Sequence, residues 1–292
     1  MADELPKVEI THTPKKVNPL ANYYRQPKLY IKLPSKGQYY PQGALDVAEN
    51  GDYAVYAMTA KDELMLKTPD ALLSGESTVQ VIKSCIPAIT DPWQMPTIDV
   101  DAALIAIRIA TYGESMDVTG TCPNCKEESK YSIPLTSMLN KAQAFDWQPV
   151  VDADPLVIKI KPYNYQMLTK TNIKALEQQR ILSIVNNDEM SEEEKLKRFN
   201  ESFVKLTELT VDTLANVVES ITSPEGEVTD REEIRNFMNN APKEIFDKVQ
   251  QAVGELKEKI EMPPQTSKCE SCEKDFTMPI TLDQSNFFAG RS

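Results

Sequence analysis

The sequence predicts an α+β fold, in which a small mixed α/β N-terminal body is joined to a two-part cysteine ribbon interrupted by a mainly helical insertion. Three observations support this prediction. Alternating β-prone runs and one strongly apolar helical segment precede Gly113. Two C-x-x-C pairs are each followed by polar residues and a short β-prone run. Between the pairs, helix-capping patterns and helical periodicity dominate.

The two cysteine pairs are the most specific signal in the chain. Cys122 and Cys125 occur in TCPNCKEESKYSIPL, and Cys269 and Cys272 occur in SKCESCEKDFTMPITL. Two such turns can supply four thiolates to a tetrahedral ion, so we predict a split four-cysteine zinc ribbon with one structural zinc per chain. Catalytic zinc is disfavoured, because four cysteines leave no position for water or substrate. Two disulfides, unrelated surface cysteines and a dithiol redox role for one pair are the alternatives.

Composition and charge restrict the class of function. The 292 residues are 41% hydrophobic and 26% charged, which is typical of a globular protein. We find no long apolar run and no apolar N-terminal stretch, so we expect no membrane span and a protein kept in a reducing cytoplasm. Residues 1–44 carry seven Lys/Arg and three Asp/Glu, a charge of +4, so the remainder carries −16 to give the net −12. An acidic body argues against nucleic acid as the main ligand.

The N-terminal elements follow from local patterns. Residues 1–27 contain four prolines and few aliphatic residues, so we expect an extended arm. Residues 28–135 are predicted to form the α/β body ending in the first knuckle. Its predicted elements are a strand at 28–33, a strand at 52–58, a helix capped by Thr59, a helix at 77–86 and a buried central helix at 99–112. Cys85 lies among apolar residues and is expected to be a small buried hydrophobe.

Residues 136–266 are predicted to be the mainly helical insertion, and residues 267–292 the second knuckle with a C-terminal tail. Ser191 and Glu194 form a capping-box pattern, and a second pattern of this kind begins at Thr229. The turn signal at 224–226 is expected to end the helix that Ser191 opens. The predicted elements are a strand at 156–160, helices at 163–185 and 191–221, a helix opened by 229–232 and an amphipathic helix at 243–260.

Tyrosines and basic residues gather where the arm meets the body. Five of the eleven tyrosines fall between positions 23 and 40. Aromatic residues and arginine are enriched at the centres of protein interfaces, so the cluster is a candidate partner surface. Ordinary strand and turn composition explains the same pattern equally well. The candidate partner-binding residues are Tyr23, Tyr24, Arg25, Tyr39 and Tyr40.

Six phrases in the N-terminal half form an ordered set. They are LPSKGQYYPQGA (33–44), MTAKDELML (58–66), LLSGES (72–77), PWQMPTID (92–99), AIRIATYG (106–113) and CPNC (122–125). The set resembles the T4-type bacteriophage baseplate hub protein family, over residues 28–135 and the closing knuckle at 269–280. The resemblance implies a structural or assembly component of a contractile phage tail baseplate, in the hub region. It implies other baseplate or tail proteins as partners and a location in the virion after assembly in the host cytoplasm.

The residues themselves give no support to catalysis. We find no glycine-rich phosphate loop, no G-x-S-x-G and no histidine-containing metal motif, and the single histidine, His12, lies in the arm. We therefore predict a non-enzymatic protein with no small-molecule substrate, nucleic acid or membrane as its partner. The alternative is a nucleic-acid-binding zinc-ribbon regulatory factor, which predicts basic knuckles. Instead, Lys126 and Lys130 are balanced by Glu127 and Glu128, and Lys268 and Lys274 are outnumbered by Glu270, Glu273 and Asp275.

Overall fold

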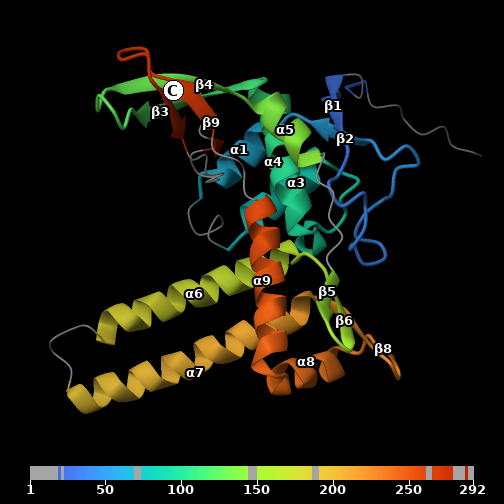
Figure 1. Cartoon of the computed structure of the whole chain (residues 1–292). Helices are drawn as coiled ribbons and strands as arrows, with labels where there is room; N and C mark the ends of the chain where they lie inside the picture. Colours follow the sequence, from blue (N-terminus) through green and yellow to red (C-terminus); the bar gives the residue numbers. More distant parts are fainter. Residues whose placement is uncertain are drawn as a thin grey trace, which may run out of the picture.

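The computed structural model describes residues 19–20, 23–68, 74–143, 150–185, 191–260, 265–278 and 287–288. The first elements are β1 (Pro27–Ile31), β2 (Tyr53–Tyr56), α1 (Ala60–Leu66), α3 (Glu76–Cys85), the 3-10 helix η2 (Pro92–Gln94), α4 (Thr97–Tyr112), β3 (Ser115–Thr121), β4 (Glu128–Pro134) and α5 (Leu135–Gln143). The later elements are β5 (Val150–Ala153), β6 (Leu156–Ile160), α6 (Tyr165–Val185), α7 (Glu192–Val217), β7 (Val218–Ser223), β8 (Gly226–Val228), α8 (Arg231–Asn240), α9 (Lys243–Ile260), β9 (Gln265–Lys268) and β10 (Asp275–Met278). In Figure 1 the elements up to α5 form the upper part of the molecule with β9, and α6, α7, α8 and the β5–β8 sheet form the lower part.

Helix α4 is the centre of the N-terminal body. Each residue from 102 to 107 is at most 2% exposed, so the middle of the helix is buried around its whole circumference. Residues of β1, β2, α3 and α5 pack around it, and Phe287 and Phe288 complete the same core. This confirms the predicted buried helix, which begins at Thr97, two residues before the predicted start.

A buried carboxylate ties the turn after β1 to α4. Asp99 Oδ1 accepts a hydrogen bond from the Ser35 amide at 2.7 Å. Asp99 Oδ2 accepts from Ser35 Oγ at 2.5 Å and from the Tyr40 hydroxyl at 2.9 Å. Burial raises the pKa of Asp99 to about 6, although these three hydrogen bonds oppose the rise. The turn is therefore fixed to the core by a group whose charge is costly to bury.

The insertion has a core of its own, built on a four-stranded antiparallel sheet in the order β5-β6-β7-β8. Helices α7, α8 and α9 supply the apolar residues that cover this sheet. Ile158, Val218, Ile221 and Ile234 are at most 5% exposed at the centre of the cluster. The insertion is thus mainly helical, as predicted, but its core contains a sheet of which only the strand at 156–160 was expected.

The predicted helix at 191–221 is wrong at its C-terminal end. Ser191 caps α7 as expected, but α7 ends at Val217 and the next six residues form β7. β7 pairs with β6 on one side and with β8 across the turn at 224–225. Strand pairing and the burial of Val218 and Ile221 therefore decide the local structure against continued helix.

The remaining helices lie close to their predicted positions. α9 spans Lys243–Ile260, which are the predicted bounds. The cap of α8 is Asp230 and not Thr229, because Asp230 Oδ1 accepts hydrogen bonds from the amides of Glu232 and Glu233, both at 3.0 Å. Among the described helices, none combines the length and the apolar character that crossing a membrane requires.

A short β-bridge joins the body to the insertion. The amide of Thr97 donates to the carbonyl of Tyr163, and the amide of Tyr165 donates to the carbonyl of Met95, each at 2.8 Å. The rings of Trp93 and Tyr165 stack beside the bridge with their centroids 5.8 Å apart. This pairing holds the chain extended up to residue 164, so α6 begins at Tyr165 and not at the predicted Tyr163.

Candidate metal centre

Each cysteine pair lies in a tight turn between two antiparallel strands. β3 and β4 form one hairpin, and β9 and β10 form the other. The β-prone run predicted after each pair is present as β4 and β10, and the structure adds β3 and β9 before the pairs. Figure 1 shows β9 lying next to β3 and β4, although the two hairpins are separated in the sequence by the whole insertion.

The two turns have the same backbone geometry. In each, the amide of the first cysteine donates to the carbonyl five residues later, and the amide four residues later donates back to the cysteine carbonyl. The N···O distances of these bonds lie between 2.9 and 3.0 Å. Lys126 and Glu273 occupy equivalent positions in the two turns and both are left-handed, with φ of 64° and 57°. The two halves of the ribbon are therefore structural equivalents.

The hairpins bring four sulfur atoms together. The Sγ atoms of Cys122, Cys125, Cys269 and Cys272 all lie within 4.8 Å of one another. Between hairpins, Cys125 Sγ is 3.6 Å from Cys269 Sγ, and Cys122 Sγ is 3.8 Å from Cys272 Sγ. These separations exceed the roughly 2.05 Å of a disulfide bond. They agree with the separation of about 3.8 Å between sulfurs that surround a tetrahedral ion at about 2.3 Å.

Backbone amides favour the thiolate form of two of the cysteines. Hydrogen bonds from the amides of Cys272 and Ser271 lower the pKa of Cys269. Those from the amides of Cys125 and Asn124 lower the pKa of Cys122. At Cys125 the amide of Glu127 acts in the same direction, but burial and the neighbouring sulfurs raise the pKa of the thiol overall. Four thiolates this close would repel one another without a cation between them, and a bound metal deprotonates its thiol ligands.

Contacts between the hairpins surround the cluster. Tyr131 and Phe276 pack edge to face at 5.3 Å, over the fully buried Cys122 and Cys269. Lys274 Nζ donates to Asn124 Oδ1 at 2.9 Å across the two turns. The arrangement can hold one tetrahedral ion, and its four sulfurs leave no coordination position for a substrate. Cys85 lies elsewhere, fully buried in the core of the body as predicted.

The predicted partner-binding residues divide into exposed and anchored side chains. Tyr23 is 84% exposed and Tyr24 is 59% exposed. Arg25 instead contacts the body, donating to the carbonyl of Ala57 at 2.6 Å and to the carbonyl of Ser84 at 2.5 Å. Tyr40 also faces inward, through its hydrogen bond to Asp99. Tyr39 is half-buried beside a cavity.

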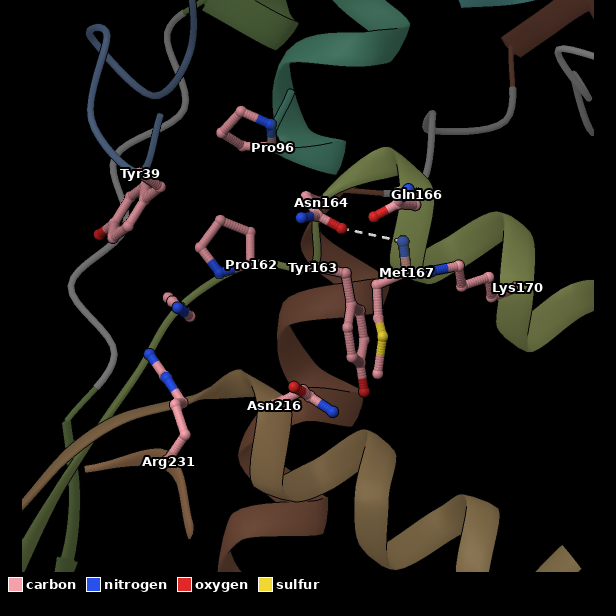
Figure 2. Close-up of a pocket in the computed structure, with 11 residues that line it drawn as sticks. Tyr39, Pro96, Pro162, Tyr163, Asn164, Gln166, Met167, Lys170, Asn216 and Arg231 are labelled. Carbon is pink, nitrogen blue, oxygen red and sulfur yellow. Dashed lines mark hydrogen bonds between the residues drawn. The ribbon is translucent and has the colours of Figure 1, made fainter. Parts of the chain in front are cut away.

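That cavity is a second candidate site, which sequence reasoning missed. It has a volume of about 250 Å³ and lies where the body meets the insertion. Figure 2 shows its lining, drawn from the turn after β1, the connection into α6, and α6, α7 and α8. Lys161, Lys170 and Arg231 are among the lining residues. They lie in three separate segments of the chain and share no motif, so no spacing pattern could have indicated them.

The chain matches the model of a known protein family. The model of a family described as T4 bacteriophage base plate protein matches residues 26–289. The matched region includes the body, the insertion and both cysteine pairs. Neither the curated proteins nor the solved structures contain a match to the chain.

Proposed function

The chain belongs to the T4 bacteriophage base plate protein family, and from this premise we propose that it is a structural or assembly component of the hub region of a contractile tail baseplate. Family membership supports a structural role in the phage virion and contact with other tail or baseplate proteins. Assembly would take place in the host cytoplasm. We propose no enzymatic activity, which agrees with a cysteine cluster that has no position for a substrate.

We further propose one structural zinc per chain, with Cys122, Cys125, Cys269 and Cys272 as its ligands. The observation that carries this proposal is the convergence of sulfurs from two hairpins, where Cys125 and Cys269 are 144 positions apart in the sequence. A site of four thiolates suits zinc, which is soft enough for sulfur and satisfied by tetrahedral coordination. The ion would stabilise the fold by joining the two ends of the insertion.

Metal analysis of the reduced protein, purified without chelator, tests the zinc proposal directly. We expect one equivalent of zinc per chain. A folded sample holding less than about half an equivalent would contradict the proposal, since a structural site of this kind retains its metal through purification.

For the partner surface, we propose that Tyr23 and Tyr24 contact a neighbouring baseplate protein. Their exposure supports this role, because rigid aromatic side chains supply large contact areas at interfaces. Tyr39 stays a proposed contact residue, whereas Arg25 and Tyr40 would act indirectly. Arg25 and Tyr40 hold the segment to the body through Ser84 and Asp99.

Mass spectrometry of purified virions tests the structural role. We expect a fixed number of copies per particle, whereas an assembly factor would be present in infected cells and absent from particles. A gel-shift assay addresses the regulatory alternative. Tight, salt-sensitive binding to DNA would overturn the structural proposal in favour of a nucleic-acid-binding factor.

A further inference from the structure

The cavity between the body and the insertion is positively charged, in a chain whose net charge is −12. Lys161 follows β6, Lys170 lies in the second turn of α6, and Arg231 is the first residue of α8. No aspartate or glutamate lines the cavity in the described part of the chain. The cavity therefore brings three positive charges together in a protein whose overall charge is negative.

The positive charges of Lys161 and Arg231 repel each other. Burial lowers the pKa of Lys161, the charge of Arg231 lowers it further, and Glu219 opposes both effects. Glu219 is itself paired with Lys159, at 3.0 Å. Within the described residues, the ammonium groups of Lys161 and Lys170 have no hydrogen bond or ion pair. Lys161 is half-buried, so an anion bound beside its ammonium group would stabilise the charged form.

The guanidinium of Arg231 is held in place at the cavity wall. Its Nη1 donates to the carbonyl of Val218 at 2.5 Å, which leaves Nε and Nη2 as further donors. Figure 2 shows the Arg231 side chain rising from α8 toward Pro162. Asn164 Oδ1 already accepts from the amide of Met167 at 2.9 Å, so an anion would be bound by the basic side chains and not by the end of α6.

We propose that this cavity binds the phosphate group of a small phosphate ester. Phosphate oxygens accept short, charge-assisted hydrogen bonds from lysine and arginine, and the planar guanidinium can donate two at once. A phosphate near Lys161 and Arg231 would convert their mutual repulsion into attraction to a shared anion. Lys170 would contribute from the exposed side of the cavity.

The volume and the walls of the cavity favour an ester over a free ion. A volume of about 250 Å³ is several times the share of about 30 Å³ that one water occupies, so the cavity has room for an organic group beside a phosphate. The ring of Tyr163 lies beside the Met167 side chain and offers an apolar surface to an organic group (Figure 2). Burial raises the pKa of Tyr163 to about 12, so its hydroxyl remains a neutral donor.

Such a ligand would contact both parts of the molecule. Tyr39 and Pro96 line the cavity from the body, and the basic residues line it from the insertion. Binding would therefore strengthen the junction formed by the bridge between Pro96 and Asn164. This proposal is independent of the metal centre, since no cysteine lines the cavity in the described part of the chain.

Isothermal titration of the full chain tests the proposal, with AMP, inorganic phosphate and adenosine as separate probes. We expect AMP to bind, phosphate to bind more weakly and adenosine not to bind. Lys161→Gln should weaken AMP binding about tenfold or more, as expected for loss of a charge-assisted hydrogen bond. Lys174→Gln is the matched control, because Lys174 lies on an exposed part of α6 outside the lining. Its affinity for AMP should equal that of the wild type.

Each outcome either identifies which ligand binds, the ester or free phosphate, or contradicts the proposed site. Phosphate binding as tight as AMP binding would identify the free ion as the ligand of the same cations. Absence of binding by both AMP and phosphate would overturn the proposal, as would unchanged AMP affinity in Lys161→Gln. Without ligand, Lys161→Gln should melt no lower than the wild type, because the substitution removes repulsion with Arg231. Zinc content should be the same in all three proteins.

Discussion

The guanidinium of Arg108, in α4, donates a hydrogen bond to the backbone carbonyl of Phe287, a residue 179 positions later in the chain. The same guanidinium lies 5.3 Å from the ring centroids of both Tyr112 and Phe287. Phe287 and Phe288 pack edge to face with each other at 5.1 Å and are buried in the core of the body. Phe287 and Phe288 therefore belong to the fold of the N-terminal body.

Phe287→Ala should lower the free energy of unfolding by about 3–5 kcal/mol, the usual cost of removing a buried phenylalanine side chain. Chemical denaturation measures this change. Phe203→Ala is the matched control, because Phe203 is 62% exposed on α7. We expect the control to change stability by less than about 0.5 kcal/mol. Equal effects of the two substitutions would contradict the assignment of Phe287 to the core.

Cys122→Ser should remove stoichiometric zinc and destabilise the protein by about 3 kcal/mol or more, roughly one ligand's share of the binding free energy of a structural zinc site. Metal analysis and thermal melting measure the two effects. Cys85→Ser is the comparison, since Cys85 is buried away from the cluster. That variant should keep one zinc per chain. Loss of zinc from Cys85→Ser, or its retention in Cys122→Ser, would refute the proposed ligand set.

Asp99→Asn should change the pH dependence of stability. The pKa of Asp99 is raised from 3.8 to about 6 in the fold, so between these values the native state binds more protons than the unfolded state. The contribution of Asp99 to stability therefore falls as pH rises through this window. The stability of the wild type relative to Asp99→Asn should decrease by about 2 kcal/mol between pH 4 and pH 7.

Denaturant titrations of both proteins across this pH range measure the difference. Asp117→Asn, on the exposed side of β3, controls for removal of a carboxylate without burial. A wild-type stability that rises relative to Asp99→Asn with increasing pH would show that the three hydrogen bonds to Asp99 outweigh its desolvation.

Lys126→Gly should stabilise the first knuckle by about 0.5–1 kcal/mol, because a left-handed residue with a side chain costs roughly 1–2 kcal/mol and glycine avoids most of that cost. Lys130→Gly, four positions later in β4, should have the opposite effect of about 0.5–1 kcal/mol, since glycine weakens a strand. Thermal melting of the metal-loaded proteins compares the two. A destabilised Lys126→Gly would mean that its side chain contributes more than its backbone costs.

The double substitution Tyr23→Ala and Tyr24→Ala should impair incorporation into baseplates while leaving solubility and zinc content unchanged. Loss of a true interface anchor typically costs about 2 kcal/mol or more in binding. Complementation of a phage lacking this protein measures the yield of infectious particles. Arg25 is left intact, because its contacts with Ala57 and Ser84 make its substitution a test of stability as well. Normal yield would exclude this surface and favour the exposed Phe199 and Phe203 of α7.

The sequence predicted the helices whose apolar pattern lies within a few consecutive turns. The apolar residues of α4 and the amphipathic stripe of α9 are visible within a few turns of sequence, and both helices were expected. The change from α7 to β7 occurs between Val217 and Val218 with no turn residue to mark it. It depends on pairing with β6, which lies about sixty positions earlier, so no local signal could have shown it.

The candidate sites also differ in whether the sequence alone could predict them. The sulfur cluster could be predicted because metal chemistry admits few ligand sets, and two similar knuckles indicate one site without knowledge of the fold. The inward orientation of Arg25 and Tyr40 could not be predicted from the sequence, because their partners Ser84 and Asp99 are each 59 positions away. The basic cavity depends on how the body and the insertion pack, which only the structure describes.

The separation of the two hairpins also orders events during synthesis. A ribosome that has translated Cys125 must add 144 further residues before Cys269 exists. At about 5–20 residues per second, this interval lasts roughly 7–30 seconds. For that time the nascent chain carries an exposed half-ribbon, while the body lacks Phe287 and Phe288. A product of premature termination within the insertion would keep the first pair of thiols and never acquire the second, so closure of the ribbon marks a chain translated past Cys272.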